Sequence, residues 1–568
     1  MSAEPHPTSP PSPDAAPAPP TVAPAPRAAG LPRAVWATVA ALYVLLFPYH
    51  PGLRSPNELC RLWQTRALVE DGTLEINRAL RDYGPVGDLS VMDGRYYPSK
   101  APLLSFAAVP VYAGLRVIGG SHRYAVPEVP LVFFSRLFLT VLPTLGLLWL
   151  VRRFLSAFLS PVVADGVTVT YALGSLAFSY SLLFMSHQTT AVLLFAGFYA
   201  LWKLSRGEWR ERGYVVAGAC AGATVAAEYT GALGVLGLIL YAVLTVLGTP
   251  EAPEPWAARL KKLGRATGLA VLGALPFIVA LGLYHQATFG HPLETGYKHL
   301  NDAAYQPWHL GGFLGIRTPD PRAFTLSFFS PLRGLFTLSP FLLLALPGLA
   351  LLKRLGRTSA EGRALFWMSA ATLAGYTYFT SSFTYDSWGW TTGPRHLTGL
   401  VPFLLLPAGL VLERLRGAGR PVLSGIAAML CAASVLVTGL ATFVNYIPDD
   451  VSTPVLALAR PLLLDGYHPP NLLAWFGLPM SVAGAVLLAA LVTVAASVFG
   501  ALLRDAAGRA PPPAAWVAGL ATLAVLASAQ AAFTRNDRAD QNAVRFLESV
   551  WLQPPNRPTA PFWPRAGS

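Results

Sequence analysis

Charged residues are scarce in this chain of 568 residues: Asp, Glu, Lys and Arg make up only 12% of it, whereas 53% of the residues are hydrophobic. Soluble domains carry about 25% charged residues, so the composition excludes an ordinary soluble protein. Apolar runs recur along nearly the whole sequence, and each has the roughly 17 to 25 residues that a helix needs to cross a bilayer. We therefore expect an all-α, polytopic transmembrane protein.

Cysteine is equally scarce. The three cysteines, Cys60, Cys220 and Cys431, stand far apart and show no metal-ligand spacing, so neither a bound metal nor an intramolecular disulfide is expected. The histidines that follow Tyr284 form no compact metal motif. We expect no cofactor, and no residue pattern indicates a divalent metal.

A basic tail with interleaved aromatic residues is also missing, although the formal net charge is +13. This absence argues against nucleic acid as a partner. The basic residues instead cluster in short loops between apolar runs, which is the positive-inside pattern of membrane proteins. These clusters lie at residues 152–153, 203–212, 259–265, 353–363, 414–420 and 504–509.

The apolar runs predict about 13 membrane spans. They cover residues 33–50, 131–151, 161–180, 187–205, 213–229, 230–248, 267–286, 336–353, 364–383, 397–414, 420–442, 479–503 and 513–533. The run 101–119 contains Pro102, Pro110 and Gly114, which make a poor straight helix. If it lies in the membrane interface instead of spanning, all six basic clusters face the cytoplasm, so we expect an interfacial helix there. A miscounted hairpin at 213–248 is the alternative.

The predicted topology places the long polar loops outside. Residues 1–30 are rich in Pro and Ala and are expected to form a disordered cytoplasmic tail. The first apolar run begins near Leu31, too late for an ordinary signal peptide, and is interpreted as a signal anchor. The outer loops are then 51–100, 287–335, 384–396, 443–478 and the tail 534–568. An enzyme or receptor acting on the outer face fits this organisation; a transporter more often shows internal repeats, and none is visible.

The polar segment 51–100 holds the first candidate functional residues. Glu58 follows the first apolar run directly and can act as a general base toward a hydroxyl, although a solvated glutamate with a salt bridge to Arg54 or Arg61 is the ordinary structural interpretation. Lys100 precedes the next apolar run, so its ammonium is expected at the depth of lipid phosphates, where snorkelling lysines are also common. Asp88 and Asp93 lie between them, and Asp93-Gly94 predicts a turn.

Three further segments carry candidate residues. The segment Tyr385 to His396 is dense in Trp, Gly and Arg; its indoles, Trp388 and Trp390, can stack on sugar rings, and Arg395 can bind a phosphate with two hydrogen bonds. Arg395 would lie on the outer side, against the positive-inside bias. His187, in a tight outer turn, is a ligand, a proton carrier or a structural histidine. Glu228 lies between two apolar runs, where an ionisable group is costly.

The order and spacing of these segments resemble the GT-C superfamily of membrane glycosyltransferases, especially the bacterial branch related to protein O-mannosyltransferases and lipid A aminoarabinose transferase. These relatives carry an Asp-Glu pair after the first helix, matched here by Asn57-Glu58. Their first outer loop contains juxtamembrane helices and closes on an aromatic-x-x-Lys-Pro-like stretch, matched by Tyr97 to Pro102. A Trp/Gly-rich segment ending in Gly-Pro-Arg is matched by Trp388 to Arg395. Together the matches cover roughly residues 33 to 415.

The resemblance implies transfer of a sugar from a polyprenyl-phosphate carrier to a lipid, glycan or protein acceptor, by a single inverting displacement, on the periplasmic face of the bacterial inner membrane. Carried over by position, Glu58 is the base, Lys100 binds the phosphate and Arg395 is a second phosphate or sugar contact. Tyr97, Trp388, Trp390 and His187 are further expected substrate contacts. Residues 31–415 then form the catalytic module, residues 416–533 the C-terminal helices, and residues 534–568 a periplasmic tail.

The chain departs from this pattern at two places. The leading aspartate of the relatives is Asn57, which cannot take a proton, and their second acid falls on Ser186-His187-Gln188. The base is therefore expected to be Glu58, Asp88 or Asp93, unless the chain has lost this chemistry. A transporter or flippase of lipid-linked saccharides and a non-catalytic lipid-binding relative remain the alternatives.

Overall fold

The computed structural model describes residues 30–53, 55–119, 126–248, 255–312, 315–383, 389–505, 507–551 and 561–563, and most of these residues are helical. Six helical stretches among them are long and apolar enough to cross a membrane. They are α6, η2 and α7 (Glu128–Arg136, Leu137–Val141, Leu142–Leu155), η3 and α12 (Tyr229–Gly231, Ala232–Leu247), α13 (Trp256–Phe289), α20 (Pro421–Val444), α23 (Met480–Leu503) and α24 (Pro513–Phe533). The all-α, polytopic class is confirmed; the count of 13 spans stays a prediction.

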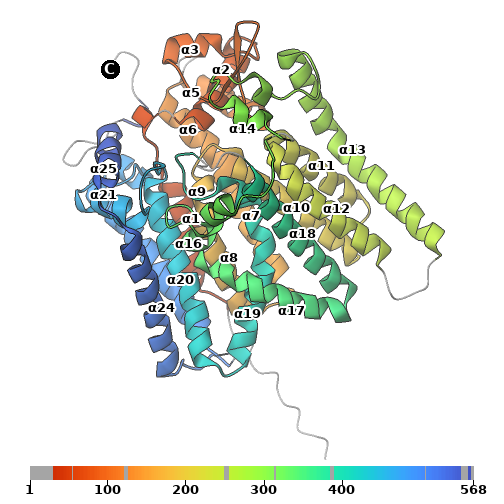
Figure 1. The fold of residues 1–568 in the computed structure, drawn as a ribbon, viewed down its shortest axis with the longest axis vertical. Coiled ribbons are helices and arrows are strands. Elements are labelled where there is room, and N and C mark those ends of the chain that lie inside the picture. The colour runs from red at the N-terminus through yellow and green to blue at the C-terminus, as the bar shows by residue number, and fades with distance from the viewer. Residues whose placement is uncertain are drawn as a thin grey trace, which may run out of the picture.

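The other apolar runs also form helices. Those that overlap predicted spans are α1 (Arg33–Leu45), α8 (Pro161–Leu173), α9 (Leu176–Ser181), α10 (Ser186–Ser205), α11 (Arg212–Ala227), α17 (Ala345–Thr358), α18 (Ala360–Ser382) and α19 (Leu405–Gly417). Side chains from most of these helices, from α20 and from α23 form the largest buried hydrophobic cluster. Among the helices that contribute to this cluster, α8 and α10 lie inside the bundle (Figure 1).

The long helices run between two chemically different ends. α10 begins at Ser186 and carries Lys203 in its last turn, and α11 returns from Arg212 to Glu228. The basic loops and the polar groups described below therefore lie at opposite ends of the same helices. We call the end with Ser186 and Glu228 the loop end, and the other the basic end. Such a separation is what the positive-inside rule expects.

Short elements gather at the loop end, at the top of Figure 1. They are η1 (Pro51–Leu53), α2 (Pro56–Glu70), α3 (Asn77–Tyr83), β1 (Leu89–Met92), β2 (Arg95–Pro98), α4 (Leu103–Ala107), α5 (Val109–Ile118), η4 (Gly296–His299) and α14 (Gln306–Leu310). α4 and α5 replace the single helix expected over 101–119. α5 packs on α2 and exposes Val117 and Ile118 at its end. Its place in the membrane interface stays a prediction.

The hairpin of β1 and β2 brings Asp88 and Lys100 together, although they are separated in the sequence. Met92 pairs with Arg95, so the loop between the strands is Asp93-Gly94, and both loop residues have positive φ angles of 51° and 74°. Such two-residue loops match the twist of a hairpin, and the predicted turn is confirmed. Because Leu89 pairs with Pro98, the residues just outside the ladder, Asp88 and Lys100, are brought side by side.

The segment after α13 crosses over this hairpin. The Ser90 hydroxyl donates to the Gly296 carbonyl at 2.7 Å, and the Asn301 amide donates to the Leu89 carbonyl at 2.9 Å. A Cβ at Gly296 would lie 2.6 Å from the Ser90 hydroxyl, so the close crossing needs glycine there. The crossing places Tyr297 over Lys100, with the ammonium 5.2 Å from the ring centre.

α11 and α13 also approach closely. Gly218 and Gly222, four residues apart on α11, face Ala270 and Ala274, and a Cβ at Gly218 would lie 1.8 Å from the Ala270 carbonyl oxygen. Small residues at this spacing let two membrane helices pack backbone to backbone. The packing fixes the end of α11, and with it Glu228.

The C-terminal region folds against the loop end as well. α25 (Arg538–Val550), in the segment predicted as a periplasmic tail, buries Ala543 and Leu547 against residues 447–462. Figure 1 shows α25 beside α21 (Arg460–Leu464). The remaining short elements are α15 (Pro321–Phe329), α16 (Leu335–Leu338), η5 (Pro340–Leu344), η6 (Arg395–Gly399), η7 (Val401–Leu404), η8 (Val455–Ala459) and α22 (Leu472–Trp475).

Candidate functional site

Ionisable side chains from separate elements meet at the loop end. α2 contributes Arg61, the hairpin flanks contribute Asp88 and Lys100, α10 contributes His187, the end of α11 contributes Glu228, and η6 contributes Arg395. We call these six residues the cationic cluster. Its members are buried or half-buried. Apart from His187, it holds three cations and two carboxylates, so it carries an excess of positive charge.

Arg61 is 1% exposed and meets no carboxylate within ion-pair distance among the described residues. Its Nη1 donates to the backbone oxygen of Asn57 at 2.8 Å and also to the Asn57 side-chain oxygen, while Nη2 donates to the Ser186 hydroxyl at 3.1 Å. Ser186 in turn donates to Glu228 Oε2 at 2.7 Å. A hydroxyl thus connects this guanidinium to the carboxylate at the end of α11.

Asp88 and Lys100 form an ion pair of 2.9 Å. Burial alone would raise the pKa of Asp88, but Lys100, and then Arg395 and Arg61, hold that pKa below its ordinary value. Burial alone would lower the pKa of Lys100, and Asp88 raises it above its ordinary value. Both groups therefore keep their charges at neutral pH.

Arg395 is the first residue of η6. Among the described residues its guanidinium makes no ion pair, and its Nε is buried without a hydrogen-bond partner. His309 stacks on Tyr297 with ring centres 4.3 Å apart, and burial, followed by the nearby Lys100, lowers the pKa of His309 to about 4. The histidine is thus neutral, and the uncompensated positive charge rests on the two arginines.

Glu58, which is predicted as a base, is surrounded by hydrogen-bond donors, and its role as a base stays a prediction. Arg136 donates to both of its carboxylate oxygens at 2.8 Å, the Phe184 amide donates at 2.5 Å, and the Tyr446 hydroxyl donates as well. The carboxylate is fully buried. Each oxygen already accepts two hydrogen bonds. This geometry is that of a structural ion pair tying α2 to α6 and to the end of α20.

The other predicted site residues lie outside the cationic cluster or outside the described residues. Asp93 is exposed at the tip of the hairpin, at the opposite end from Asp88. Tyr97 is buried against Tyr284 and Phe289. Trp390 is 42% exposed, with its ring edge-on to Phe546 of α25 at 5.5 Å. Trp388 lies outside the described residues. The structure brings together Asp88, Lys100, His187 and Arg395.

The sequence analysis assigned no functional role to Arg61, Arg136 or Tyr446. Arg61 had one usable signal, because it lies one helical turn after Asn57 and therefore on the same face of α2. Arg136 lies 78 residues from Glu58, and Tyr446 lies 388 residues away. No local spacing reports such pairings, which depend on the packing of helices.

No group of three or more His, Cys, Asp or Glu side chains suited to hold a metal is found within the described ranges. The free donors of the cluster are guanidinium and ammonium groups, which bind anions rather than metal ions. The cluster therefore suits an anionic ligand such as a phosphate.

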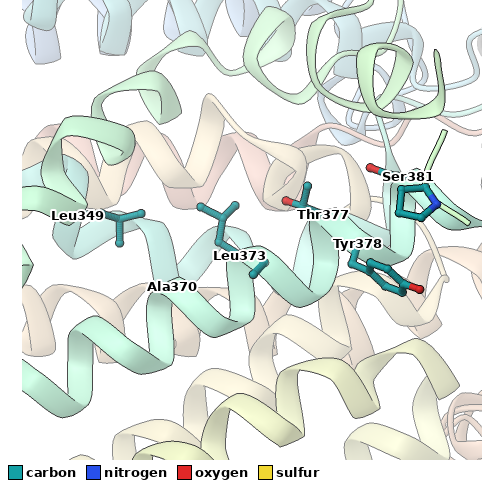
Figure 2. Close-up of a pocket in the computed structure, with 8 residues that line it drawn as sticks. Leu349, Ala370, Leu373, Thr377, Tyr378 and Ser381 are labelled. Atoms are coloured by element: carbon teal, nitrogen blue, oxygen red, sulfur yellow. The ribbon is translucent and has the colours of Figure 1, made fainter. Parts of the chain in front are cut away.

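A separate groove of about 490 Å³ runs along α18 (Figure 2). Leu349 of α17 and Leu373, Ala374 and Tyr378 of α18 line it, and Ser381 lies toward its loop end. Its walls are almost wholly apolar, which suits a hydrocarbon chain. At the loop end of α18, the Phe379 ring lies 5.6 Å from the ring of His396, the neighbour of Arg395. The groove thus approaches the cationic cluster along one helix.

The fold and this site define a polytopic helical membrane protein with a positively charged cluster of buried and half-buried side chains at one end. The chain is similar to the crystal structure of ArnT from Cupriavidus metallidurans in the apo state, with 15% identity over 86% of this chain and 76% of that chain and a TM-score of 0.43. It is also similar to ArnT bound to undecaprenyl phosphate, with 13% identity over 87% and 77% and a TM-score of 0.41.

A third solved structure is the archaeal oligosaccharyltransferase AglB from Archaeoglobus fulgidus in complex with an inhibitory peptide and a dolichol-phosphate. It shows 11% identity over 93% of this chain and 60% of that chain, with a TM-score of 0.39. Both proteins are GT-C superfamily membrane glycosyltransferases, the superfamily named from the sequence motifs. At these identities and TM-scores, substrate and residue roles depend on this chain's own geometry. No protein-family model and no curated protein matches the chain.

Proposed function

We propose that the protein transfers a sugar from a polyprenyl-phosphate donor to a hydroxyl acceptor at the loop end, by a single inverting displacement. The observation that carries this proposal is the excess positive charge of the cationic cluster. Arg61 and Arg395 meet no carboxylate among the described residues, and Lys100 meets only Asp88. Uncompensated buried charge is costly, and a phosphate dianion or diester would neutralise it.

The type of anion follows from the geometry of the donors. Guanidinium groups bind phosphate oxygens with parallel hydrogen bonds, and an ammonium adds a compact charge. The same groups stabilise a phosphate as it leaves, when its negative charge grows, which is the form of electrostatic catalysis that a glycosyl transfer from a lipid phosphate requires. The apolar groove on α18 provides a surface for the lipid chain of such a donor, within reach of the cluster.

The test is transfer by the purified protein in lipid nanodiscs. Polyprenyl-phosphate donors carrying radiolabelled hexoses or pentoses are incubated with membrane lipids, glycans and envelope proteins as acceptors, and labelled products are separated by extraction. We expect Lys100→Ala and Arg395→Ala each to lower transfer at least about 100-fold. Arg95→Ala is the matched control, because Arg95 is exposed on the same hairpin.

Three outcomes would overturn this function. Wild-type protein that transfers from no donor is not a transferase of this class. Tight binding of the lipid phosphate without turnover would indicate a non-catalytic relative. Movement of a fluorescent lipid-linked sugar across liposomes, without transfer, would indicate a flippase.

A further inference from the structure

The proposed transfer needs a group that takes the proton of the acceptor hydroxyl. Two predicted bases are already engaged: Glu58 accepts hydrogen bonds on both oxygens, and Asp88 is paired with Lys100 at 2.9 Å. Asp93 lies at the hairpin tip. The cluster contains two further proton acceptors, His187 and Glu228, and the resemblance supplied neither as a base. Glu228 already accepts a hydrogen bond from Ser186 at 2.7 Å, whereas His187 keeps one ring nitrogen without a partner among the described residues.

His187 has the geometry of an oriented base. It lies in the first turn of α10 and is 4% exposed. Its Nδ1 lies 3.6 Å from Glu228 Oε2, and its Nε2 is buried without a hydrogen-bond partner among the described residues. An imidazole with one nitrogen beside a carboxylate and the other unoccupied is the arrangement in which the carboxylate selects the tautomer and frees a lone pair for proton transfer. Such contacts are often longer before substrate binds.

His187 is buried among positively charged side chains. Arg61 reaches Glu228 through Ser186, and the cations of Arg395 and Lys100 also act on the ring. The rings of His396 and Tyr180 lie 5.4 Å and 5.3 Å away. Nearby positive charge opposes protonation. A bound lipid phosphate would offset that charge, so the ring would accept a proton more readily once the donor is in place.

We propose that His187 is the general base of the transfer and that Glu228 is the residue that positions it; this inference rests on the proposed function. The acceptor hydroxyl gives its proton to His187 Nε2 as its oxygen bonds to the anomeric carbon. The bond from that carbon to the phosphate oxygen breaks, and the polyprenyl phosphate departs as an anion held by Lys100 and the arginines. The imidazolium then releases the proton to water.

The experiment uses the full-length protein in nanodiscs with whichever donor the wild type uses. His187→Gln is expected to lower kcat by about 100-fold to 10,000-fold while KM for the donor and binding of undecaprenyl phosphate stay unchanged. His187→Gly removes the ring, and added imidazole is expected to restore part of kcat. His291→Gln is the matched control, because His291 is exposed in the loop after α13.

Glu228→Gln separates a positioning role from a structural one. Without the carboxylate the imidazole is a weaker base, so the acidic limb of the kcat profile is expected to move to lower pH while maximal kcat falls. A merely structural glutamate would change protein yield or melting temperature without moving that limb.

The outcomes separate the two proposals. A wild type inactive with every donor overturns the proposed function and this inference with it. An active wild type whose His187→Gln variant keeps its kcat, or raises only KM, overturns the inference alone. So does loss of activity in His187→Gly that imidazole does not restore. If His187→Gly is not monodisperse in gel filtration, His187→Gln and the pH limb of Glu228→Gln decide the matter.

Discussion

Asn57 determines the charge balance around Arg61. Its two oxygens accept hydrogen bonds from the guanidinium without neutralising it, at the position where the resembling enzymes carry an acid. We predict that Asn57→Asp, a change of nearly equal shape, weakens binding of undecaprenyl phosphate about tenfold, or about 1.4 kcal/mol. The new carboxylate would compete with the phosphate for Arg61.

Titration of the purified protein with undecaprenyl phosphate in detergent measures this change. Asn301→Asp is the control, because Asn301 is exposed and lies on the loop that crosses the hairpin. If Asn57→Asp bound undecaprenyl phosphate equally or more tightly, the prediction would be wrong. The neutral side chain of Asn57 would then not be the reason that Arg61 can bind an anion.

Glu58 offers a second prediction, since its ion pair with Arg136 is buried. Removing one partner of a buried pair leaves an unpaired charge and costs about 3–5 kcal/mol, whereas replacing both by apolar residues is often neutral. We expect Glu58→Gln to lower the melting temperature of the protein in detergent strongly. The double variant Glu58→Met with Arg136→Met should recover most of that loss.

The same measurement tests the role that the resemblance assigned to Glu58. If Glu58→Gln melted like the wild type but lost transfer, Glu58 would be the base after all. Loss of stability that the double variant restores, together with restored transfer, identifies the pair as a structural link.

At the scale of elements, the hairpin makes the Asp88–Lys100 pair sensitive to acid. The pKa of Asp88 is held below its ordinary value, so the stability it contributes is complete above about pH 4 and is lost as the pH falls through the lowered pKa. Asp88→Asn lacks this contribution at every pH. We expect the wild type to melt higher than Asp88→Asn at pH 6, and the difference to shrink below about pH 4 in pH-dependent thermal unfolding. A constant difference would contradict the pairing.

The groove on α18 leads to a prediction about donor length. Ala374 is exposed in the groove, so Ala374→Trp would fill part of it without disturbing the buried side of the helix. We expect this variant to raise KM for long-chain polyprenyl-phosphate donors and to leave short-chain donors unaffected. Ala371→Trp is the matched control, because Ala371 is exposed on the same helix and does not line the groove. Equal effects on both chain lengths would exclude the groove as the lipid site.

How much the sequence predicts differs between elements. Apolar runs fix the positions of helices such as α20 and α23 to within a few residues, because a bilayer-length hydrophobic segment has few alternatives. α2 shows no such signal: it is a polar helix buried by its neighbours, within a segment expected mainly as an outer loop. The turn at Asp93-Gly94 was predictable because its residue types tolerate positive φ.

The site itself was predictable only where its members lie close in sequence or in a recognisable motif. Lys100 and Arg395 came from short motifs, and the structure places both in the cluster. The pairing of Glu58 with Arg136 joins helices whose contact depends on the whole bundle, so the sequence suggested a neighbouring arginine as the partner and not Arg136. The partnership of His187 with Glu228 likewise needs the close packing that positions the end of α11.

At the scale of the whole molecule, the separation of charge predicts the orientation in the membrane. The basic end carries Arg210, exposed between α10 and α11, and the loop end carries Ala303, exposed after the hairpin crossing. Of the native cysteines, Cys60 and Cys431 are buried and Cys220 is half-buried, so both variants are made in a Cys220→Ala background. We predict that a membrane-impermeant maleimide labels Ala303→Cys in intact spheroplasts and labels Arg210→Cys only after permeabilisation. The six basic clusters would otherwise face outward, against the positive-inside rule. Labelling of both variants from outside would mean that an odd number of helices between these residues does not cross the membrane, and labelling of Arg210→Cys alone would place the cationic cluster on the cytoplasmic face.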